Sequence, residues 1–346
     1  MFTRTQTRAL KVGSLPLGGG APVSVQTMGT ADPHDAKACL TQLVSCAERG
    51  CDLFRLAVPD VEAAETLGEV RRSSPIPIVA DVHFDSRCAL AALAAGADAL
   101  RLNPGNIGGR DRVQAVARAA KEKGVPVRIG VNGGSLEPGE TPVGSALKHL
   151  RLLEDEGLRD VVISVKLSDV RKTVAAYREL AERTDCPLHL GVTEAGTLIP
   201  GTVRSSVALG MLLNDGIGDT VRVSLTSDPV DEPRAALEIL RALGLRKGIR
   251  FVSCPTCGRT QINVMGIAQR VTKEFSDIDL PVTVAVMGCV VNGPGEARDA
   301  DIALCGGKDC GELFIHGKPV KKLTGDLAEG FVQAVREYLR LSATDA

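Results

Sequence analysis

Residues 53–83 read LFRLAVPDVEAAETLGEVRRSSPIPIVADVH and form one strand–helix–strand unit. Leu53–Val58 and Ile76–His83 are apolar runs of strand length, whereas Val61–Arg72 has the apolar spacing of a helix with one buried face. Strands joined in this way by a helix pair in parallel. The stretch therefore predicts an α/β fold built on a parallel sheet.

The same unit recurs along the first two thirds of the chain. The predicted strands are Val23–Met28, Leu53–Val58, Ile76–His83, Ala99–Asn103, Val125–Asn132, Val161–Leu167, Leu188–Glu194 and Thr220–Thr226. Eight such units favour a closed (β/α)8 TIM-type barrel. A doubly wound open sheet is the alternative, but no phosphate-loop lysine motif and no convincing Gly-x-Gly-x-x-Gly turn supports it.

The regular alternation ends after the helix predicted at Glu232–Leu243, which should close the barrel. We expect a barrel domain over residues 1–248 and a small α+β domain over residues 249–346. The second domain should contain a strand at Thr283–Met287 and an amphipathic helix at Asp326–Leu341. The Gly/Pro-rich segment 9–22 could form a hairpin that plugs one end of the barrel.

Composition and charge narrow the class of protein. The chain has 346 residues, a formal net charge of -1 and 44% hydrophobic residues. Such a balance argues against general binding to nucleic acid or to a membrane surface. No apolar run is long enough to span a bilayer, and the first residues do not resemble a secretory signal. We therefore expect a cytoplasmic protein whose ten cysteines stay mostly reduced.

Two cysteine-containing stretches lie in the second domain. Residues 253–258 read SCPTCG, and residues 287–296 read MGCVVNGPGE. Together they offer the thiols of Cys254, Cys257 and Cys289, and the carboxylate of Glu296. Three thiolates with a weaker fourth ligand suit zinc or an iron–sulfur cluster, and the residues alone leave that choice open. A redox disulfide or inert thiols are the less favoured interpretation.

Basic residues recur in the predicted barrel strands, at the ends where such barrels place their active sites. They are Arg55, Arg101, Arg128, Lys166 and Arg222. So many cations in one mouth would repel one another unless an anion binds there, and the fork of Arg suits phosphate oxygens. Asp81 and Glu194 could neutralise two of the five. We therefore expect a polyanionic ligand, most simply a diphosphate.

Hydrogen-bonding groups lie at a similar depth in the predicted strands. They are Asp81, His83, Asn132, Thr193, Glu194 and Ser224. A carboxylate such as Glu194 beside an anion site suggests a group that handles a proton or binds a substrate hydroxyl. His189 lies earlier in its strand and is interpreted as a core histidine with its hydrogen bonds satisfied.

The chain resembles the 4-hydroxy-3-methylbut-2-en-1-yl diphosphate synthase family of the methylerythritol phosphate route to isoprenoids. The matching runs are Val79–Asp85, Leu188–Gly196, Gly218–Leu225, Cys254–Cys257 and Met287–Ala297, and the likeness extends from about Val23 to Tyr338. The resemblance implies a [4Fe–4S] cluster held by Cys254, Cys257, Cys289 and, unusually, Glu296. It also implies reductive ring opening and dehydration of 2-C-methyl-D-erythritol 2,4-cyclodiphosphate.

The resemblance also implies roles and partners. Phosphate oxygens would be held by Arg55, Arg101, Arg128, Lys166, Arg222 and Ser224. The hydroxyl side or the proton path would be lined by Asp81, His83, Asn132, Thr193 and Glu194. Electrons would come from ferredoxin or flavodoxin, and a head-to-tail homodimer would bring one subunit's cluster domain over the other's barrel. Two further thiols, Cys305 and Cys310, leave the fourth ligand open.

Two other functions remain possible at this stage. The first is a zinc-structured (β/α)8 enzyme that acts on a phosphosugar. The second is an iron–sulfur protein whose barrel only senses a ligand.

Overall fold

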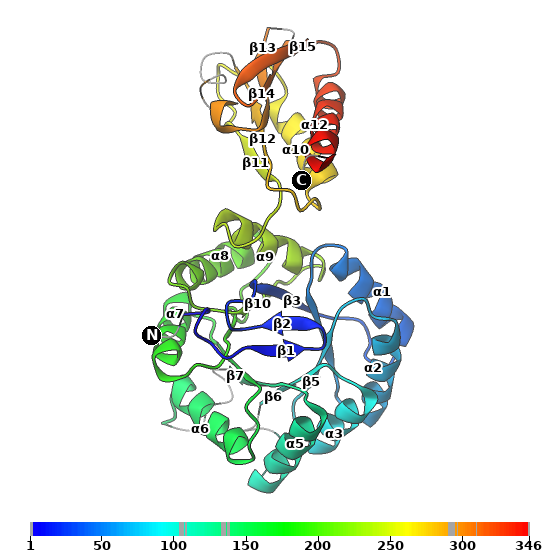
Figure 1. The fold of residues 1–346 in the computed structure, drawn as a ribbon, viewed down its shortest axis with the longest axis vertical. Coiled ribbons are helices and arrows are strands. Elements are labelled where there is room, and N and C mark those ends of the chain that lie inside the picture. The colour runs from blue at the N-terminus through cyan, green and yellow to red at the C-terminus, as the bar shows by residue number, and fades with distance from the viewer. Residues whose placement is uncertain are drawn as a thin grey trace. The chain divides into compact units, whose positions relative to one another are not determined.

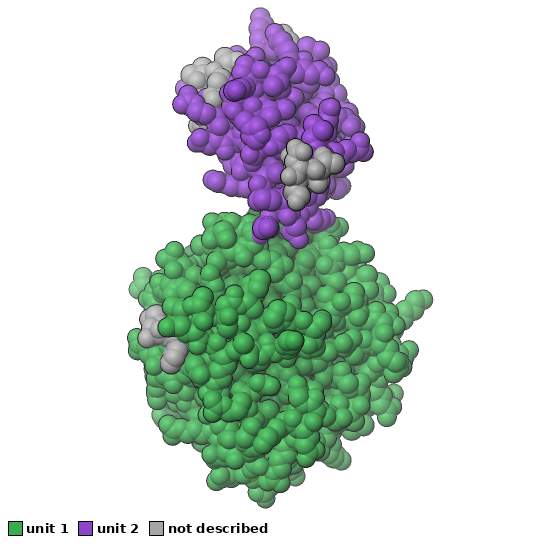
Figure 2. Space-filling view, viewed as in Figure 1, with its two compact units in different colours: residues 1–246 green, residues 247–346 purple. Residues whose placement is uncertain are grey.

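The computed structural model describes residues 3–103, 107, 109–132, 136, 139–289, 295, 297–308 and 310–344. The chain forms two compact units, residues 1–246 and residues 247–346 (Figure 2). We expected a boundary after residue 248. In the described residues no helix is both long and apolar enough to cross a membrane.

The first unit is a parallel barrel, as expected (Figure 1). Its strands are β3 (Ser24–Met28), β4 (Leu53–Ala57), β5 (Ile78–Val82), β6 (Ala99–Leu102), β7 (Val127–Asn132), β8 (Val161–Lys166), β9 (His189–Leu190) and β10 (Thr220–Val221). Their order in the sheet is β8-β7-β6-β5-β4-β3-β10-β9. A bridge between Ile163 of β8 and Leu188, next to β9, joins the two ends of this order.

Helices surround this sheet and follow the predicted rhythm (Figure 1). They are α1 (Ala36–Ala47), α2 (Val61–Ser73), α3 (Ser86–Ala95), α5 (Arg110–Lys123), α6 (Pro142–Asp155), α7 (Val170–Arg183), α8 (Leu198–Asn214) and α9 (Asp231–Ala242). The helices α2 and α3 begin at Asp60 and Asp85, whose carboxylates accept backbone N–H groups of the first turn. At its other end α3 stops at Gly96, which has a φ of 94°.

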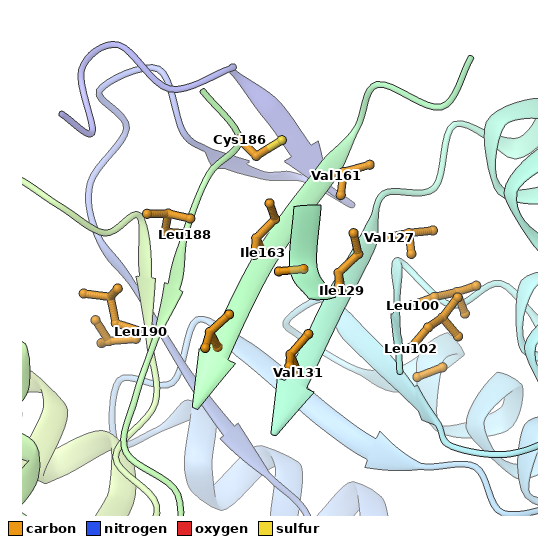
Figure 3. Packing of buried hydrophobic residues seen from close by; sticks show 14 of the residues in the cluster. Leu100, Leu102, Val127, Ile129, Val131, Val161, Ile163, Cys186, Leu188 and Leu190 are labelled. Carbon is orange, nitrogen blue, oxygen red and sulfur yellow. The ribbon is translucent and has the colours of Figure 1, made fainter. Parts of the chain in front are cut away.

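Alternation along each strand separates the core from the barrel interior. In Figure 3 the labelled apolar residues of β6, β7 and β8 belong to one cluster with the inner faces of the helices. Because side chains of a strand alternate between its two faces, the residues between these apolar positions turn into the barrel. This alternation directs the polar residues described below to the interior.

The N-terminal segment forms the expected hairpin, with β1 (Leu10–Val12) paired antiparallel to β2 (Leu15–Leu17). Leu10, Val12 and Leu17 are buried together with residues near the starts of four barrel strands, namely Leu53, Val79, Ala99 and Val162. The hairpin therefore closes the barrel at the end where its strands begin. The opposite end, where the strands finish, carries the loops and is left for a ligand.

Two strands are much shorter than predicted, whereas the other six differ by three residues or fewer. The expected runs Leu188–Glu194 and Thr220–Thr226 contain regular strand only at β9 and β10. Beyond these strands the backbone forms loops, which hold Glu194 and Ser224 at the end of the barrel where strands finish.

The second unit is a five-stranded sheet with two long helices, in the order β11-β12-β13-β14-β15. Its elements are β11 (Arg250–Ser253), α10 (Val264–Phe275), β12 (Thr283–Met287), the short helix η2 (Ala297–Asp299), β13 (Ile302–Gly307), β14 (Cys310–Ile315), β15 (Lys318–Leu323) and α12 (Leu327–Thr344). The predicted strand and the predicted C-terminal helix correspond to β12 and α12. The first three strands run parallel, so the loops that follow β11 and β12 leave the same edge of the sheet.

Candidate active site

Asp81 on β5 is the hub of the charged groups inside the barrel. Its carboxylate lies 3.5 Å from Nε of Arg55, 3.2 Å from Nη1 of Arg101 and 3.2 Å from Nε2 of His83. Burial alone would raise the pKa of Asp81, but Arg55, His83 and Arg101 together hold it well below its usual value. Asp81 is therefore a fixed negative charge that orients two arginines and one histidine.

Glu232, at the start of α9, is the second carboxylate of the cluster. It receives two hydrogen bonds from Arg222, from Nε at 2.9 Å and from Nη2 at 3.1 Å, and a third from Oγ1 of Thr27 at 2.6 Å. The sequence suggested that Glu194 could neutralise one of the cations, but the residue is exposed, and Glu232 is the carboxylate that pairs with Arg222. The sequence indicated the role of Glu232 only weakly, because acidic residues in the first turn of a helix usually interact favourably with the helix dipole.

Two of the five cations face neutral partners. Nη1 of Arg128 donates to Oε1 of Gln26 at 2.7 Å, and Nζ of Lys166 lies 3.2 Å from Nε2 of His189. Burial first, and then the neighbouring cations, lower the pKa values of Arg128 and Lys166 well below their usual range. Burial also lowers the pKa of Arg55, to about 10, with Arg222 and Arg101 adding to the shift.

The cluster therefore carries a surplus of positive charge. Among the described residues, five cations share the two buried carboxylates of Asp81 and Glu232. Arg128 lies near the start of β7 and not at its end as we expected, and its Nη2 is buried without a hydrogen-bond partner. Buried charges are costly unless paired, so the arrangement favours a bound anion with several oxygens.

Two glycines make room for the cationic side chains. A Cβ added at Gly130 would lie 2.4 Å from Nε of Arg101, and one added at Gly191 would lie 3.0 Å from Nζ of Lys166. Atoms at such separations must shift, so any larger residue at these positions would displace a cation. The missing side chains are therefore part of how the interior holds its charges.

We expect Asp81→Asn to destabilise the protein by about 3–5 kcal/mol, since it leaves the buried Arg101 and the half-buried Arg55 without their carboxylate. Denaturant unfolding measures this loss, and inorganic pyrophosphate should recover more stability in the variant than in the wild type.

The contribution of the Asp81 carboxylate to the free energy of unfolding is present above about pH 4 and is lost as the pH falls, because its pKa is depressed in the folded state. Asp155→Asn removes an exposed pair and should cost under about 1 kcal/mol. Equal losses would contradict the hub role.

Glu194 lies on a loop whose backbone is held on both sides. Its φ is 54°, a left-handed value that residues other than glycine seldom adopt. The flanking N–H of Thr193 donates to the carbonyl of Leu167 at 3.2 Å, and the carbonyl of Ala195 accepts from Nη1 of Arg204 at 2.8 Å. Strained backbone that its neighbours enforce in this way is concentrated at functional positions.

The remaining predicted residues also lie where strands finish. Asn132 is the last residue of β7 and is in register with Lys166, the last residue of β8. Ser224 lies just beyond β10, and Asn132, Thr193 and Ser224 are all half-buried. The barrel therefore has basic groups in its interior and neutral polar groups at the end where its strands finish. This arrangement suits a phosphorylated ligand with hydroxyl groups.

In the second unit, the first two cysteine-bearing segments leave one sheet edge. Cys254 directly follows β11, and its Sγ accepts the N–H of Gly288, next to Cys289, at 3.0 Å. Cys257 is exposed, and hydrogen bonds from the backbone and side chain of Arg259 lower its pKa. The lowered pKa favours the thiolate of Cys257, the form that binds iron or zinc. The residues present therefore fit a metal centre.

The described residues include only part of the predicted ligand set. Glu296 lies outside the described residues, and within the described ranges no group of three or more His, Cys, Asp or Glu residues is gathered closely enough for a metal ion. Cys305 is buried in β13, and Cys310 is half-buried at the start of β14. Which residue is the fourth ligand stays a prediction.

Comparisons with known proteins cover both units. Residues 7–237 match the GcpE TIM-barrel domain, and residues 250–337 match the GcpE protein C-terminal domain. A protein of Geobacter sulfurreducens named 4-hydroxy-3-methylbut-2-en-1-yl diphosphate synthase (flavodoxin) is 55% identical, over 97% of this chain and 99% of its own. A protein of Symbiobacterium thermophilum with the same name is 51% identical, over 97% and 94% of the two chains.

Two solved structures match about two thirds of this chain. Dihydropteroate synthase of Yersinia pestis matches with a TM-score of 0.52 at 14% identity, over 68% of this chain and 98% of its own. Phospho-2-dehydro-3-deoxyheptonate aldolase of Thermotoga maritima matches with a TM-score of 0.52 at 10% identity, over 70% and 77% of the two chains. At these identities the likeness shows the fold and no more.

Proposed function

The chain belongs to the GcpE family, and from this premise we propose how its residues divide the work of the reaction. That reaction is the reductive ring opening and dehydration of 2-C-methyl-D-erythritol 2,4-cyclodiphosphate to 4-hydroxy-3-methylbut-2-enyl diphosphate, in isoprenoid precursor biosynthesis. The enzyme is an iron–sulfur oxidoreductase, and its relatives are named for flavodoxin as electron donor. Neither the zinc enzyme nor the ligand sensor is favoured by these relatives.

In our proposal the cyclic diphosphate occupies the cationic interior of the barrel. The observation that carries it is the surplus of buried positive charge around Asp81 and Glu232. The phosphate oxygens would be held by Arg55, Arg101, Arg128, Lys166, Arg222 and Ser224. These groups stabilise the charge that develops on the diphosphate as its C–O bond breaks, because they are fixed before the substrate arrives.

The other polar groups of the site would bind the hydroxyl groups of the substrate or transfer a proton to it. Asp81 and His83 lie within the charged cluster, while Asn132 and Thr193 lie where their strands or loops open. We assign these four to the hydroxyl side of the ring. Glu194 is the proposed proton donor to the departing hydroxyl, because it is an exposed carboxyl on a loop that its neighbours hold in place.

The second unit would hold a [4Fe–4S] cluster through Cys254, Cys257 and Cys289, with Glu296 as the replaceable fourth ligand. When bound, such a cluster supplies electrons one at a time and one iron that can meet a substrate oxygen. The chain itself donates hydrogen bonds to the cysteine sulfurs. The N–H of Gly288 donates to Cys254, and the backbone and side chain of Arg259 donate to Cys257. Hydrogen bonds of this kind stabilise thiolate sulfur and tune its reduction potential.

We further propose a homodimer in which the site is shared between subunits. One face of α8 supports an association through the barrel, since it exposes large apolar residues at intervals of about one helical turn. They are Leu198, Ile199, Val203, Val207 and Met211, of which Ile199 is 76% exposed. Contiguous exposed apolar surface of this kind is typical of a protein interface. We propose that a second copy of this chain packs against this face of α8. A cytoplasmic location stays a prediction.

Iron and sulfide analysis after anaerobic purification tests the proposed cofactor. We expect about four iron and four sulfide per chain, and turnover of the cyclic diphosphate with reduced flavodoxin. Zinc in place of iron would overturn the cluster assignment. A loaded cluster without turnover of the cyclic diphosphate would overturn the proposed division of roles.

A further inference from the structure

His189 is the one histidine enclosed by the barrel wall, among the residues that the structure describes, and it is wholly buried. It alternates in sequence with Leu188 and Leu190, which pack in the outer core (Figure 3). Its ring therefore turns inward, where Nε2 lies 3.2 Å from Nζ of Lys166 and Nδ1 lies 3.3 Å from Oγ1 of Thr220. The sequence had suggested only a core histidine with satisfied hydrogen bonds.

We propose that His189 is a positioning residue, which accepts a hydrogen bond from the ammonium of Lys166 and so holds that cation ready for a phosphate oxygen. The ammonium is a donor only, so it requires an unprotonated Nε2. The proton of the neutral ring must then lie on Nδ1, from which it is donated to Oγ1 of Thr220. One tautomer thus satisfies both contacts of the ring.

The surrounding backbone fixes this chain of contacts. The hydroxyl of Tyr177 donates to the carbonyl of His189 at 2.5 Å and accepts the N–H of Val165 at 3.1 Å. β9 is thereby fastened to β8 immediately before Lys166. Thr220 is the register partner of His189 across β9 and β10, so the strand pairing also sets the position of the hydroxyl.

Gly191 lies next to the side chain of Lys166. A Cβ at this site would lie 3.0 Å from both Nζ and Cε of Lys166, and 2.7 Å from the carbonyl oxygen of Arg222. The lysine side chain therefore passes through space that the glycine leaves open. Gly191 therefore leaves room for Lys166, and His189 supplies the contact at the end of the side chain.

Burial lowers the pKa of His189 well below its usual value, and the charges of Arg128 and Lys166 reinforce the shift. The ring is therefore a neutral acceptor and adds no charge to the cationic site. A second ammonium or guanidinium in its place could not accept a hydrogen bond from Lys166. A neutral acceptor is what a crowded group of cations requires.

This inference rests on the proposed role of Lys166 in holding phosphate, and a matched pair of variants separates the two. His189→Gln keeps an acceptor oxygen near the place of Nε2, whereas His189→Met has a similar length without a strong acceptor. Inorganic pyrophosphate should bind the Met variant about 10-fold more weakly, which is the cost of ordering a free lysine side chain. The Gln variant should stay within about 3-fold of the wild type, because it restores the lost hydrogen bond.

The outcomes distinguish the inference from the proposed function. If Lys166→Met leaves pyrophosphate affinity unchanged, the phosphate role of Lys166 is wrong. If Lys166→Met weakens binding but the Gln and Met variants of His189 behave alike, only the positioning role is overturned. In the cluster-loaded enzyme, His189→Met should raise KM for the cyclic diphosphate and also lower kcat, because a loosely held Lys166 stabilises less well the charge that develops on the diphosphate.

A spectroscopic measurement needs no variant. In the wild-type protein with pyrophosphate bound, ¹⁵N NMR of His189 should show Nδ1 protonated and Nε2 unprotonated. A protonated Nε2 would overturn the proposed hydrogen bond from Lys166. Thermal unfolding of each variant shows whether the chain still folds. The ¹⁵N result is obtained on the wild-type protein, so it holds even if a variant does not fold.

Discussion

Cys289→Ala should abolish turnover, and mixing it with a second inactive chain should restore part of the activity. Cys289 is a proposed cluster ligand, so its loss leaves too few thiolates to hold the iron. The second chain is Lys166→Met, which removes a phosphate-binding cation. Lys166 pairs with no carboxylate in the described contacts, so its removal leaves no uncompensated negative charge.

The geometry of a shared site sets the size of the rescue. In a heterodimer, the barrel of the Cys289→Ala chain would meet the cluster of the Lys166→Met chain, and this site has no defect. The other site has both defects. A confirmed heterodimer should therefore have about half of wild-type activity, as a two-fold arrangement of sites requires. Activity assays on heterodimers isolated with two different affinity tags measure it.

A reciprocal control uses the same two substitutions in one chain. Paired with a wild-type chain, this double variant places one defect in each shared site and should leave the heterodimer inactive. If each subunit instead works alone, the double variant with wild type would keep about half of the activity, and the first mixture would have none. That reversal would rule out the shared site.

Glu194→Gln should lower kcat by about 10²–10⁴-fold and leave substrate binding nearly unchanged, as expected for the loss of a proton donor. Glutamine has the same shape and keeps a hydrogen-bond donor, but it cannot release a proton. Single-turnover rates and equilibrium binding of the cyclic diphosphate, measured on the same cluster-loaded preparation, separate the two effects. Equal losses in rate and affinity would show that Glu194 binds substrate and transfers no proton.

The backbone at Glu194 provides a control for structural damage. Its φ of 54° strains any residue with a side chain. Glu194→Gly should therefore match or exceed wild-type stability by up to about 1 kcal/mol, and still lose the same activity as Glu194→Gln. A stable glycine variant without activity would show that the strained backbone is kept for the carboxyl group.

The strand–helix rhythm was enough to predict the barrel, and the end of that rhythm predicted the small second domain. Periodicity reports which face of each element is buried, and that property is local to the sequence. The limits of β9 and β10 were less predictable. Their runs continue with alternating apolar residues such as Val192 and Val223, but the regular strand ends after two residues in each case. Where a strand stops depends on its neighbours in the barrel, which periodicity does not report.

The partners of the charged groups were the least predictable part of the site. Arg222 pairs with Glu232 and not with Glu194, and the neutral acceptors Gln26 and His189 face Arg128 and Lys166. These pairs join residues from different strands or elements. Sequence can show that a residue is charged and lies on an inward face. It cannot show which side chain across the barrel reaches it.

The sequence by itself determined the parallel barrel, the inward direction of its cations and the cysteine-bearing unit, because alternation and residue chemistry are properties of the chain read in order. Only the tertiary structure decided which charges are compensated, that Arg128 lies deep beside Gln26, and that His189 faces Lys166. Those facts depend on distances between strands far apart in sequence. Closing the sheet into a barrel sets such distances, and no local pattern encodes them.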